Sequence, residues 1–483
     1  MQLIRWVLLP SLTSALVVIG LVQACRWIAG VSPRLGLLVA AGLGVRVAAA
    51  LGLFWISYLH LPILSSLQNG PGFWRMALDS QGYYRLAVYG AEQGLSTIPP
   101  GASSRTYVAA LALWMSLTGT SVFSGVVLNL CCYVGTCALL IAVLRGLPAR
   151  WFERTAMVSV AALSASPMLL FVSTQVLKDS FFLFFAVLLN AGVWLLAAPM
   201  AERASSAWKR MALGVPAVVA AIVVTAGVRG YYPAIAVVAC GFLLISLILR
   251  SRRHYRVVAL AAALSLVAGA GALRLGSEAG MAYFRVLTSI RTPADVMKTL
   301  SGARGAFIVA GGATNVADGV GDAGAIGAHR DTDSVAGVAE AMSIGVATMF
   351  VPLTLLQALS IVHVSGGGAM RALGDIDTVC FDIMMVATAV MTWRLRREVR
   401  GNAPYMVFSI SLALMLTVLM AYIVTNVGTL VRLRLMLAVP FWTMTFAFAR
   451  LPRLVGGDAI DQPNEVFDRR GATTAGSIGT KQV

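Results

Sequence analysis

Apolar runs of about twenty residues recur along nearly the whole chain, and short polar or basic loops separate them. A helix of that length matches the thickness of the hydrocarbon core of a bilayer. The pattern therefore predicts an all-α polytopic membrane protein with about 11 transmembrane helices. The expected spans are 6–25, 37–58, 121–144, 155–172, 179–198, 211–228, 232–249, 257–275, 377–393, 404–425 and 433–449.

The composition agrees with a membrane protein. Hydrophobic residues make up 59% of the 483 residues and charged residues only 12%, a balance that no soluble domain of this length needs. A net charge of +17 would suggest a nucleic-acid partner in a soluble protein. Here the basic residues gather in loops between apolar runs, so the positive-inside rule explains them and we expect no nucleic-acid partner.

The basic loops also predict the orientation. If all of them face the cytoplasm, the N-terminus lies outside and the C-terminus inside. The loops contain Arg26 and Arg34; Arg145, Arg150 and Arg154; Arg203, Lys209 and Arg210; Arg250, Arg252, Arg253 and Arg256; Arg394, Arg396, Arg397 and Arg400; and Arg450 and Arg453. The first run lacks a small-residue cleavage site and precedes Arg26, so we expect a retained span and not a signal peptide.

One apolar segment, 341–363, does not fit this alternation, since a full crossing would place the Arg394 loop outside. We therefore expect re-entrant or interfacial helices around Pro352. A Gly-rich stretch before it is either a flexible lid or a plain linker. The expected parts are an N-terminal span and loop (1–35), a transmembrane core (36–275) with an outer loop (59–120), an outer segment (276–376), C-terminal spans (377–455) and a disordered cytoplasmic tail (456–483).

Carboxylates are scarce, with 20 in the chain, so their positions are informative. Asp79 and Glu92 lie in the outer loop, and Asp179 follows Lys178 at the start of an expected span. An ionisable group at membrane depth costs about 2.5–3.5 kcal/mol, so it usually faces the bundle interior or a wet cavity. Lys178 and Asp179 therefore either belong to a site or form a local ion pair at the membrane surface. In a third alternative, Asp179 is a helix N-terminal acid near the positive end of the helix dipole.

Three arginines on the expected outer side are not explained by topology: Arg229, Arg432 and Arg434. A guanidinium offers forked donors that suit a phosphate group. They therefore predict a specific anionic lipid ligand, with snorkelling to bulk lipid as the alternative. The six cysteines lie in or beside apolar runs without a metal-ligand pattern, so we expect packing residues. The outer segments show no acid cluster with metal-ligand spacing, so we expect no obligatory metal and no cofactor. A need for a divalent cation stays open.

An ordered series of residues carries a family resemblance. It begins with the intramembrane Arg46 and continues with Asp79 and a Tyr-Tyr-x-x-Ala pattern from Tyr83 to Ala87. The segments TYVAALALWMSLTGTSVFSGVVLNL and ASPMLLFVSTQVLKDSFFLFF follow, and NVGTLVRLRLMLAVP comes near the C-terminus. The series resembles the bacterial GT-C superfamily of membrane glycosyltransferases, which includes relatives of dolichyl-phosphate-mannose protein mannosyltransferases and lipid A aminoarabinose transferases. The likeness covers about residues 35–250.

The resemblance implies that a sugar moves from a polyprenyl-phosphate donor to an envelope glycan, lipid or protein acceptor. The reaction would occur at the outer face of a bacterial inner membrane. The resemblance further implies that Asp79 is the general base or positions the acceptor. Many members have a second acid directly beside the first. This chain has Ser80 there, so a second acid is absent or comes from Glu92 or Asp179.

The remaining residues of the expected site would bind the substrates. Arginines suit the phosphate of the leaving lipid, which gives a role to the three outer arginines. Tyr83 and Tyr84 either stack on a sugar ring or anchor the loop at the membrane interface. Lys178 completes the substrate-binding set.

Three other functions compete with this one. An envelope polysaccharide polymerase or ligase would use an oligosaccharide on a lipid diphosphate instead of a monosaccharide on a monophosphate. A lipid-linked sugar flippase or other transporter would place charges along a central path. The sequence has no inverted repeat and no paired Gly- or Pro-broken spans in corresponding halves, which disfavours a transporter. A structural membrane subunit is the third alternative.

Overall fold

The protein is helical in the part of the chain that its computed structural model describes: residues 8–102, 104–197, 204–250, 335–361, 368–398, 402–423 and 427–450. Within these ranges no β-strand is present, which confirms the all-α prediction. The expected span at 257–275, the Gly-rich stretch and the tail at 456–483 lie outside the described residues.

The long helices match most of the expected spans. They are α1 (Leu9–Val31), α2 (Pro33–Tyr58), α5 (Val122–Leu144), α6 (Ala149–Ala165), α8 (Asp179–Ala197), α9 (Ala204–Ala226), α10 (Tyr231–Arg250), α16 (Gly368–Glu398), α17 (Ala403–Ile423) and α18 (Val427–Thr443). The shorter helices are α3 (Leu78–Gln93), α4 (Arg105–Thr118), α7 (Pro167–Thr174), α14 (Val335–Phe350), α15 (Leu353–Ala358) and the 3-10 turn η5 (Met444–Phe448). In the described ranges seven helices are long and apolar enough to cross a membrane, or eight if the bent pair α6–α7 is one span. The chain is therefore a multi-pass membrane protein.

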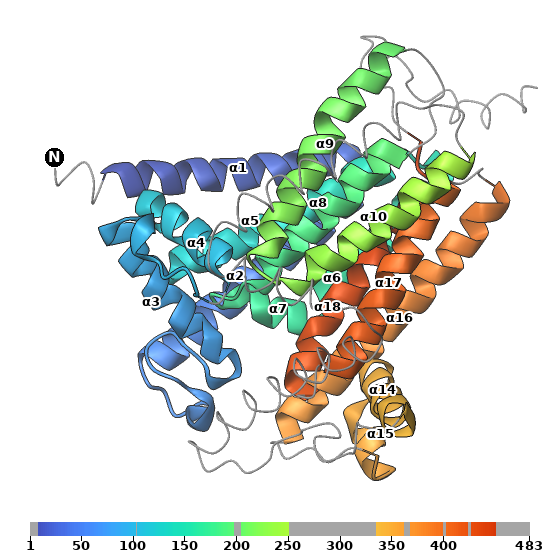
Figure 1. Ribbon diagram of the computed structural model, residues 1–483. Coiled ribbons are helices and arrows are strands. Elements are labelled where there is room, and N and C mark those ends of the chain that lie inside the picture. Colours follow the sequence, from blue (N-terminus) through green and yellow to red (C-terminus); the bar gives the residue numbers. More distant parts are fainter. Residues whose placement is uncertain are drawn as a thin grey trace, which may run out of the picture.

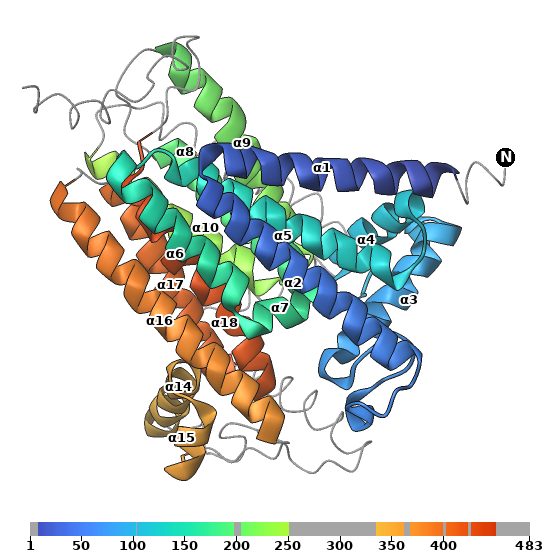
Figure 2. The same ribbon diagram turned by 180° about the vertical axis from the view of Figure 1, so that it is seen from behind.

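The long helices form one bundle (Figures 1 and 2). Helix α8 lies near its centre, where it packs against α5, α9, α17 and α18. Helices α3 and α4 lie together at one side of the bundle, and α14 and α15 lie at one end of it (Figure 1). Helix α1 packs against α2, α4 and α5 but leaves most of its apolar surface uncovered, as expected for a helix in contact with lipid.

Three of the expected basic loops meet at one end of the bundle. After α1, Arg34 forms an ion pair with Glu153 near the start of α6, with 3.7 Å between nitrogen and oxygen. After α18, the backbone N–H of Arg450 donates a hydrogen bond to the carbonyl of Gly146 in the α5–α6 loop, 2.7 Å away. Helix α6 starts at this end, so α7 and the start of α8 lie at the other. This arrangement agrees with the predicted grouping of the basic loops.

The expected span at 155–172 is not one straight helix. Helix α6 ends at Ala165, and α7 starts at Pro167 with a bend of 62° between the two axes. A proline has no backbone N–H and its ring clashes with the preceding turn, so it can break a helix at this point. The Ser166 hydroxyl then accepts a hydrogen bond from the N–H of Leu169, 3.2 Å away, which caps the new helix.

The expected pair of helices around Pro352 is present. Helix α14 ends at Phe350, and α15 starts directly after the proline. Gly345 of α14 lies so close to α17 that a Cβ atom would come within 2.1 Å of the Ala421 carbonyl oxygen. This close approach explains why a glycine stands there, and it fixes α14 against the bundle.

Candidate functional site

A buried ion pair lies at the end of the bundle opposite the basic loops. Asp179 is the first residue of α8, and Arg229 lies in the turn between α9 and α10. A guanidinium nitrogen of Arg229 contacts a carboxylate oxygen of Asp179, and the side chains are only 7% and 3% exposed. Either charge would be costly to bury alone, so each depends on the other. The pair joins two turns that lie far apart in the sequence.

Lys178 connects this ion pair to helix α3 and to the residue before helix α4. Its ammonium group donates a hydrogen bond to the hydroxyl of Ser104, which donates to the carbonyl of Val228, 3.2 Å away. The Tyr83 hydroxyl lies 3.5 Å from the same Ser104 oxygen, and the Lys178 nitrogen lies 5.6 Å from the centre of the Tyr83 ring. Tyr83, Ser104, Lys178, Asp179 and Arg229 are called the site cluster below.

Two further tyrosines border the site cluster. Arg229 donates a hydrogen bond to the hydroxyl of Tyr231, 3.4 Å away, and that hydroxyl donates to the sulfur of Met436 on α18, 3.7 Å away. The ring of Tyr107 meets the ring of Tyr83 edge-on, with 5.5 Å between centroids. Burial holds the pKa of Tyr107 well above its usual range, and nearby groups that include Asp179 raise it further. The Tyr107 hydroxyl therefore keeps its proton at neutral pH.

Sequence reasoning found four of the five members of the site cluster and missed Ser104. It also missed the bordering Tyr107 and Tyr231. For Tyr231 a signal existed, because it follows Arg229 closely in VRGYYP. For Ser104 the signal is conformational and cannot be read from the sequence: its φ of 58° lies in the left-handed region, where serine is uncommon. The conformation places the Ser104 side chain between Lys178 and the α9–α10 turn.

Asp79 lies beside the site cluster and not inside it. It is exposed in the first turn of α3, four residues before Tyr83, so the two side chains lie on the same face of that helix. Glu92 is exposed near the other end of α3. Of the three predicted acids, Asp179 is thus buried in an ion pair, whereas Asp79 and Glu92 are exposed on the surface of α3.

Tyr84 has a structural contact and is not a member of the site cluster. Its hydroxyl donates a hydrogen bond to the carbonyl of Thr120, 2.9 Å away, and its ring lies 5.5 Å from the ring of Phe73. Burial raises the pKa of Tyr84, and the negative charge of Glu92 raises it further. Tyr84 therefore attaches α3 to the loop before α5.

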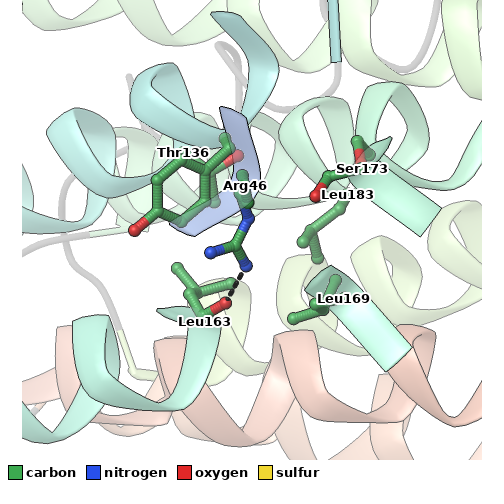
Figure 3. Close-up of a pocket in the computed structure, with 8 residues that line it drawn as sticks. Arg46, Thr136, Leu163, Leu169, Ser173 and Leu183 are labelled. Carbon is green, nitrogen blue, oxygen red and sulfur yellow. Dashed lines mark hydrogen bonds between the residues drawn. The ribbon is translucent and has the colours of Figure 1, made fainter. Parts of the chain in front are cut away.

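A second polar centre lies at the break between α6 and α7 (Figure 3). Pro167 cannot donate to the carbonyl of Leu163, four residues before it. A nitrogen of the buried Arg46 guanidinium takes that role at 2.6 Å, and the other terminal nitrogen donates to the carbonyl of Gly42 at 3.1 Å. The guanidinium also lies 3.9 Å from the centre of the Tyr133 ring. Arg46 thus satisfies the carbonyl end of α6 at membrane depth.

A small cavity lies beside the Arg46 guanidinium. Its volume of about 10 Å³ is enough for about one water molecule. It is lined by Arg46, Tyr133, Thr136, Leu169, Ser173 and Ser180. In Figure 3 Arg46 points toward Leu163, with Leu169, Ser173 and Leu183 across the cavity.

Asp377 of α16 accepts hydrogen bonds from the start of α7, on the other side of this break. One carboxylate oxygen accepts hydrogen bonds from the hydroxyl of Ser166 at 2.6 Å and from the N–H of Met168 at 3.1 Å. The other oxygen lies 3.4 Å from a guanidinium nitrogen of Arg434, which is 1% exposed. Arg434 is therefore engaged inside the protein, away from the site cluster. Arg432 lies on α18, and its side chain is outside the described part.

In the described ranges no group of three or more His, Cys, Asp or Glu side chains is placed to hold a metal ion. Comparison of the chain with protein-family models, with curated proteins and with solved structures finds no match.

Proposed function

We propose that the protein is a membrane glycosyltransferase of the GT-C type, which moves a sugar from a polyprenyl-phosphate donor to an envelope glycan, lipid or protein acceptor. One observation carries this proposal. An exposed carboxylate, Asp79, lies one helical turn from Tyr83, and Tyr83 belongs to the site cluster with Lys178 and Arg229. A proton acceptor and two cations thus occupy one end of the bundle.

The reaction assigns a role to each of these groups. The acceptor hydroxyl gives its proton to Asp79 while its oxygen attacks the anomeric carbon of the sugar. The bond between that carbon and the phosphate oxygen breaks, and polyprenyl phosphate leaves with the electron pair. Lys178 and Arg229 carry two positive charges against the one negative charge of Asp179, so the cluster keeps a net positive charge for the phosphate. Asp179 holds Arg229 in place and is not the second catalytic acid.

An apolar cavity near the site cluster supports a lipid-linked donor. It has a volume of about 410 Å³ and lies between α10, α14 and α17. Its lining includes Ile235, Met342 and Val418. Ile235 lies one helical turn after Tyr231, the hydrogen-bond partner of Arg229. A phosphate near Arg229 would therefore place its hydrocarbon chain close to an apolar surface.

We also propose that the protein crosses a bacterial inner membrane eleven times. The basic loops would then lie in the cytoplasm and the site cluster at the outer face. Seven long apolar helices and the bent α6–α7 pair account for eight spans. The shorter apolar helices at Arg210–Ala226 and Leu433–Phe448, together with the expected span at 257–275, would supply the other three.

The proposal is tested with Asp79→Asn, which keeps the size of the side chain but removes the proton acceptor. The purified protein is incubated with labelled polyprenyl-phosphate sugars, and release of polyprenyl phosphate is measured. We expect turnover to fall by about 100-fold or more, the usual contribution of a positioned base. Glu92→Gln is measured in parallel, because it neutralises the other exposed acid of α3 and tests whether Glu92 is the second acid. Near-normal turnover of Asp79→Asn would contradict the assignment.

The α6–α7 break favours a second candidate, a transporter of lipid-linked sugars. Helices broken at membrane depth and compensated by charged groups are typical of transporter binding sites. The α6–α7 pair is one broken helix pair in the described residues, whereas the sequence showed no paired breaks in corresponding halves. Reconstituted vesicles distinguish the two functions. A transferase releases polyprenyl phosphate when an acceptor is present, whereas a transporter moves the intact donor to the other leaflet.

A further inference from the structure

The break between α14 and α15 is built in the same way as the break between α6 and α7. A proline starts the second helix or directly precedes it in each case. At the α14–α15 break, Arg434 donates a hydrogen bond to the carbonyl of Met349, in the last turn of α14, at 3.1 Å. The carboxylate of Asp375 accepts hydrogen bonds from the N–H groups of Leu353 and Thr354 at the start of α15. An arginine thus caps one helix and an aspartate caps the next.

Helix α16 supplies the aspartate at both breaks. Asp375 and Asp377 are two residues apart, so their side chains leave the helix about 200° apart and face nearly opposite sides. Asp375 faces α15, and Asp377 faces α7. The guanidinium of Arg434 connects the two breaks, because it contacts both the Met349 carbonyl and the Asp377 carboxylate.

Helix α7 carries this connection to the site cluster. It has only 8 residues, and Asp377 holds its first turn. The carbonyl of Gln175, directly after α7, accepts a hydrogen bond from the buried amide of Asn129 at 2.7 Å. Lys178 and Asp179 follow within four residues. The position of α7 therefore contributes to where Lys178 and Asp179 lie, together with the Asn129 contact.

We infer that Asp377 and Arg434 form a positioning pair, which couples the α14–α15 segment to the α7–α8 turn and so places Lys178 and Asp179 in the site cluster. The pair is almost fully buried, where ionic contacts are strong and an unpaired charge is costly. Helix α18 also contacts the border of the cluster, since Met436 lies two residues after Arg434 and accepts a hydrogen bond from Tyr231, the partner of Arg229. The consequence for turnover rests on the proposed function, but the mechanical coupling does not.

Hydrogen exchange of the full chain in lipid nanodiscs tests the coupling without an activity assay. In Arg434→Gln, amides in 345–361 and in 166–178 should both exchange about tenfold faster or more, because Arg434 no longer bonds the carbonyl of Met349 and no longer holds the Asp377 carboxylate that caps α7. Lys178 should also react faster with an amine-labelling reagent, since its contact with Ser104 loosens. Arg434→Lys, which keeps the charge, should partly restore the exchange in 166–178.

Asp375→Asn is the matched control, because it weakens the cap of α15 from the same helix without touching the ion pair. It should speed exchange in 351–361 only. The inference is overturned if Arg434→Gln changes only 345–361 and leaves Lys178 labelling as in the wild type. If Arg434→Gln does not fold, Asp377→Asn/Arg434→Gln removes both buried charges and should fold. Unchanged exchange in 166–178 of that double variant also overturns the coupling.

Discussion

The guanidinium of Arg46 donates a hydrogen bond of 2.6 Å to the carbonyl oxygen of Leu163, the carbonyl that Pro167 leaves without a helical partner. The two residues belong to different helices, α2 and α6. A buried cation in the membrane interior is stabilised here by backbone carbonyls at the negative end of a helix. The relationship explains both why an arginine is tolerated inside α2 and why α6 can end in the middle of an apolar segment.

Arg46→Met should lower the stability of the protein. The variant removes the buried charge but leaves the carbonyls of Leu163 and Gly42 without this donor, which should cost about 2–4 kcal/mol. The thermal unfolding midpoint in detergent measures the change. The additional substitution Pro167→Ala should recover part of the loss, because it restores a backbone N–H that can reach the Leu163 carbonyl. A double variant no more stable than Arg46→Met would contradict this account of the break.

The ion pair of the site cluster allows stability and function to be separated. Asp179→Asn leaves Arg229 buried without its charge partner and should destabilise the protein by about 3–5 kcal/mol. Asp179→Leu/Arg229→Met removes both charges and should regain most of that stability. Donor turnover should stay low in the double variant, because the cation for the phosphate is gone. Thermal midpoints and turnover are measured on the same preparations, and recovery of turnover would exclude Arg229 from phosphate binding.

The fold class could be predicted from hydropathy because a bilayer imposes one length and one backbone solution on each span. The break at Pro167 could not be predicted from hydropathy. Pro216 lies inside α9 and Pro440 inside α18 without ending either helix, so a proline alone does not decide the outcome. At Pro167 the deciding factors are Arg46 and Asp377, which neighbouring helices supply from distant parts of the sequence.

In the candidate site, the contacts between residues could not be predicted from the sequence either. Charge and position identified Lys178, Asp179 and Arg229 one by one, but their pairing depends on how α8 and α9 pack. Arg434 illustrates the opposite outcome. Its charge predicted a phosphate contact, whereas its surroundings engage it with Asp377 and the carbonyl of Met349. Charged residues in apolar segments can be identified from the sequence as candidate site residues. Their interaction partners can be identified only from the tertiary structure.

Tyr107→Phe should change how stability depends on alkaline pH. The pKa of Tyr107 is raised in the folded state by burial, so above the unfolded value of 10 the folded protein keeps a proton that the unfolded chain has lost. Stability therefore falls as pH rises above that value. Removing the hydroxyl removes this contribution, so the thermal midpoint of the variant should fall less steeply above pH 10 than that of the wild type. Parallel curves for the two proteins would show that Tyr107 does not contribute.

The orientation of the bundle can be tested with reporters that are active only in the cytoplasm. The contacts between Arg34 and Glu153 and between Arg450 and Gly146 bring three basic loops to one end, and the positive-inside rule predicts that this end faces the cytoplasm. A reporter fused after Arg400 or after Arg453 should therefore be active, and one fused within residues 310–330 should be silent. A reporter of the opposite kind, active only outside, serves as the control at each position. An active cytoplasmic reporter at 310–330 would invert the bundle and place Asp79 and the site cluster in the cytoplasm, where an outer-face transfer reaction is impossible.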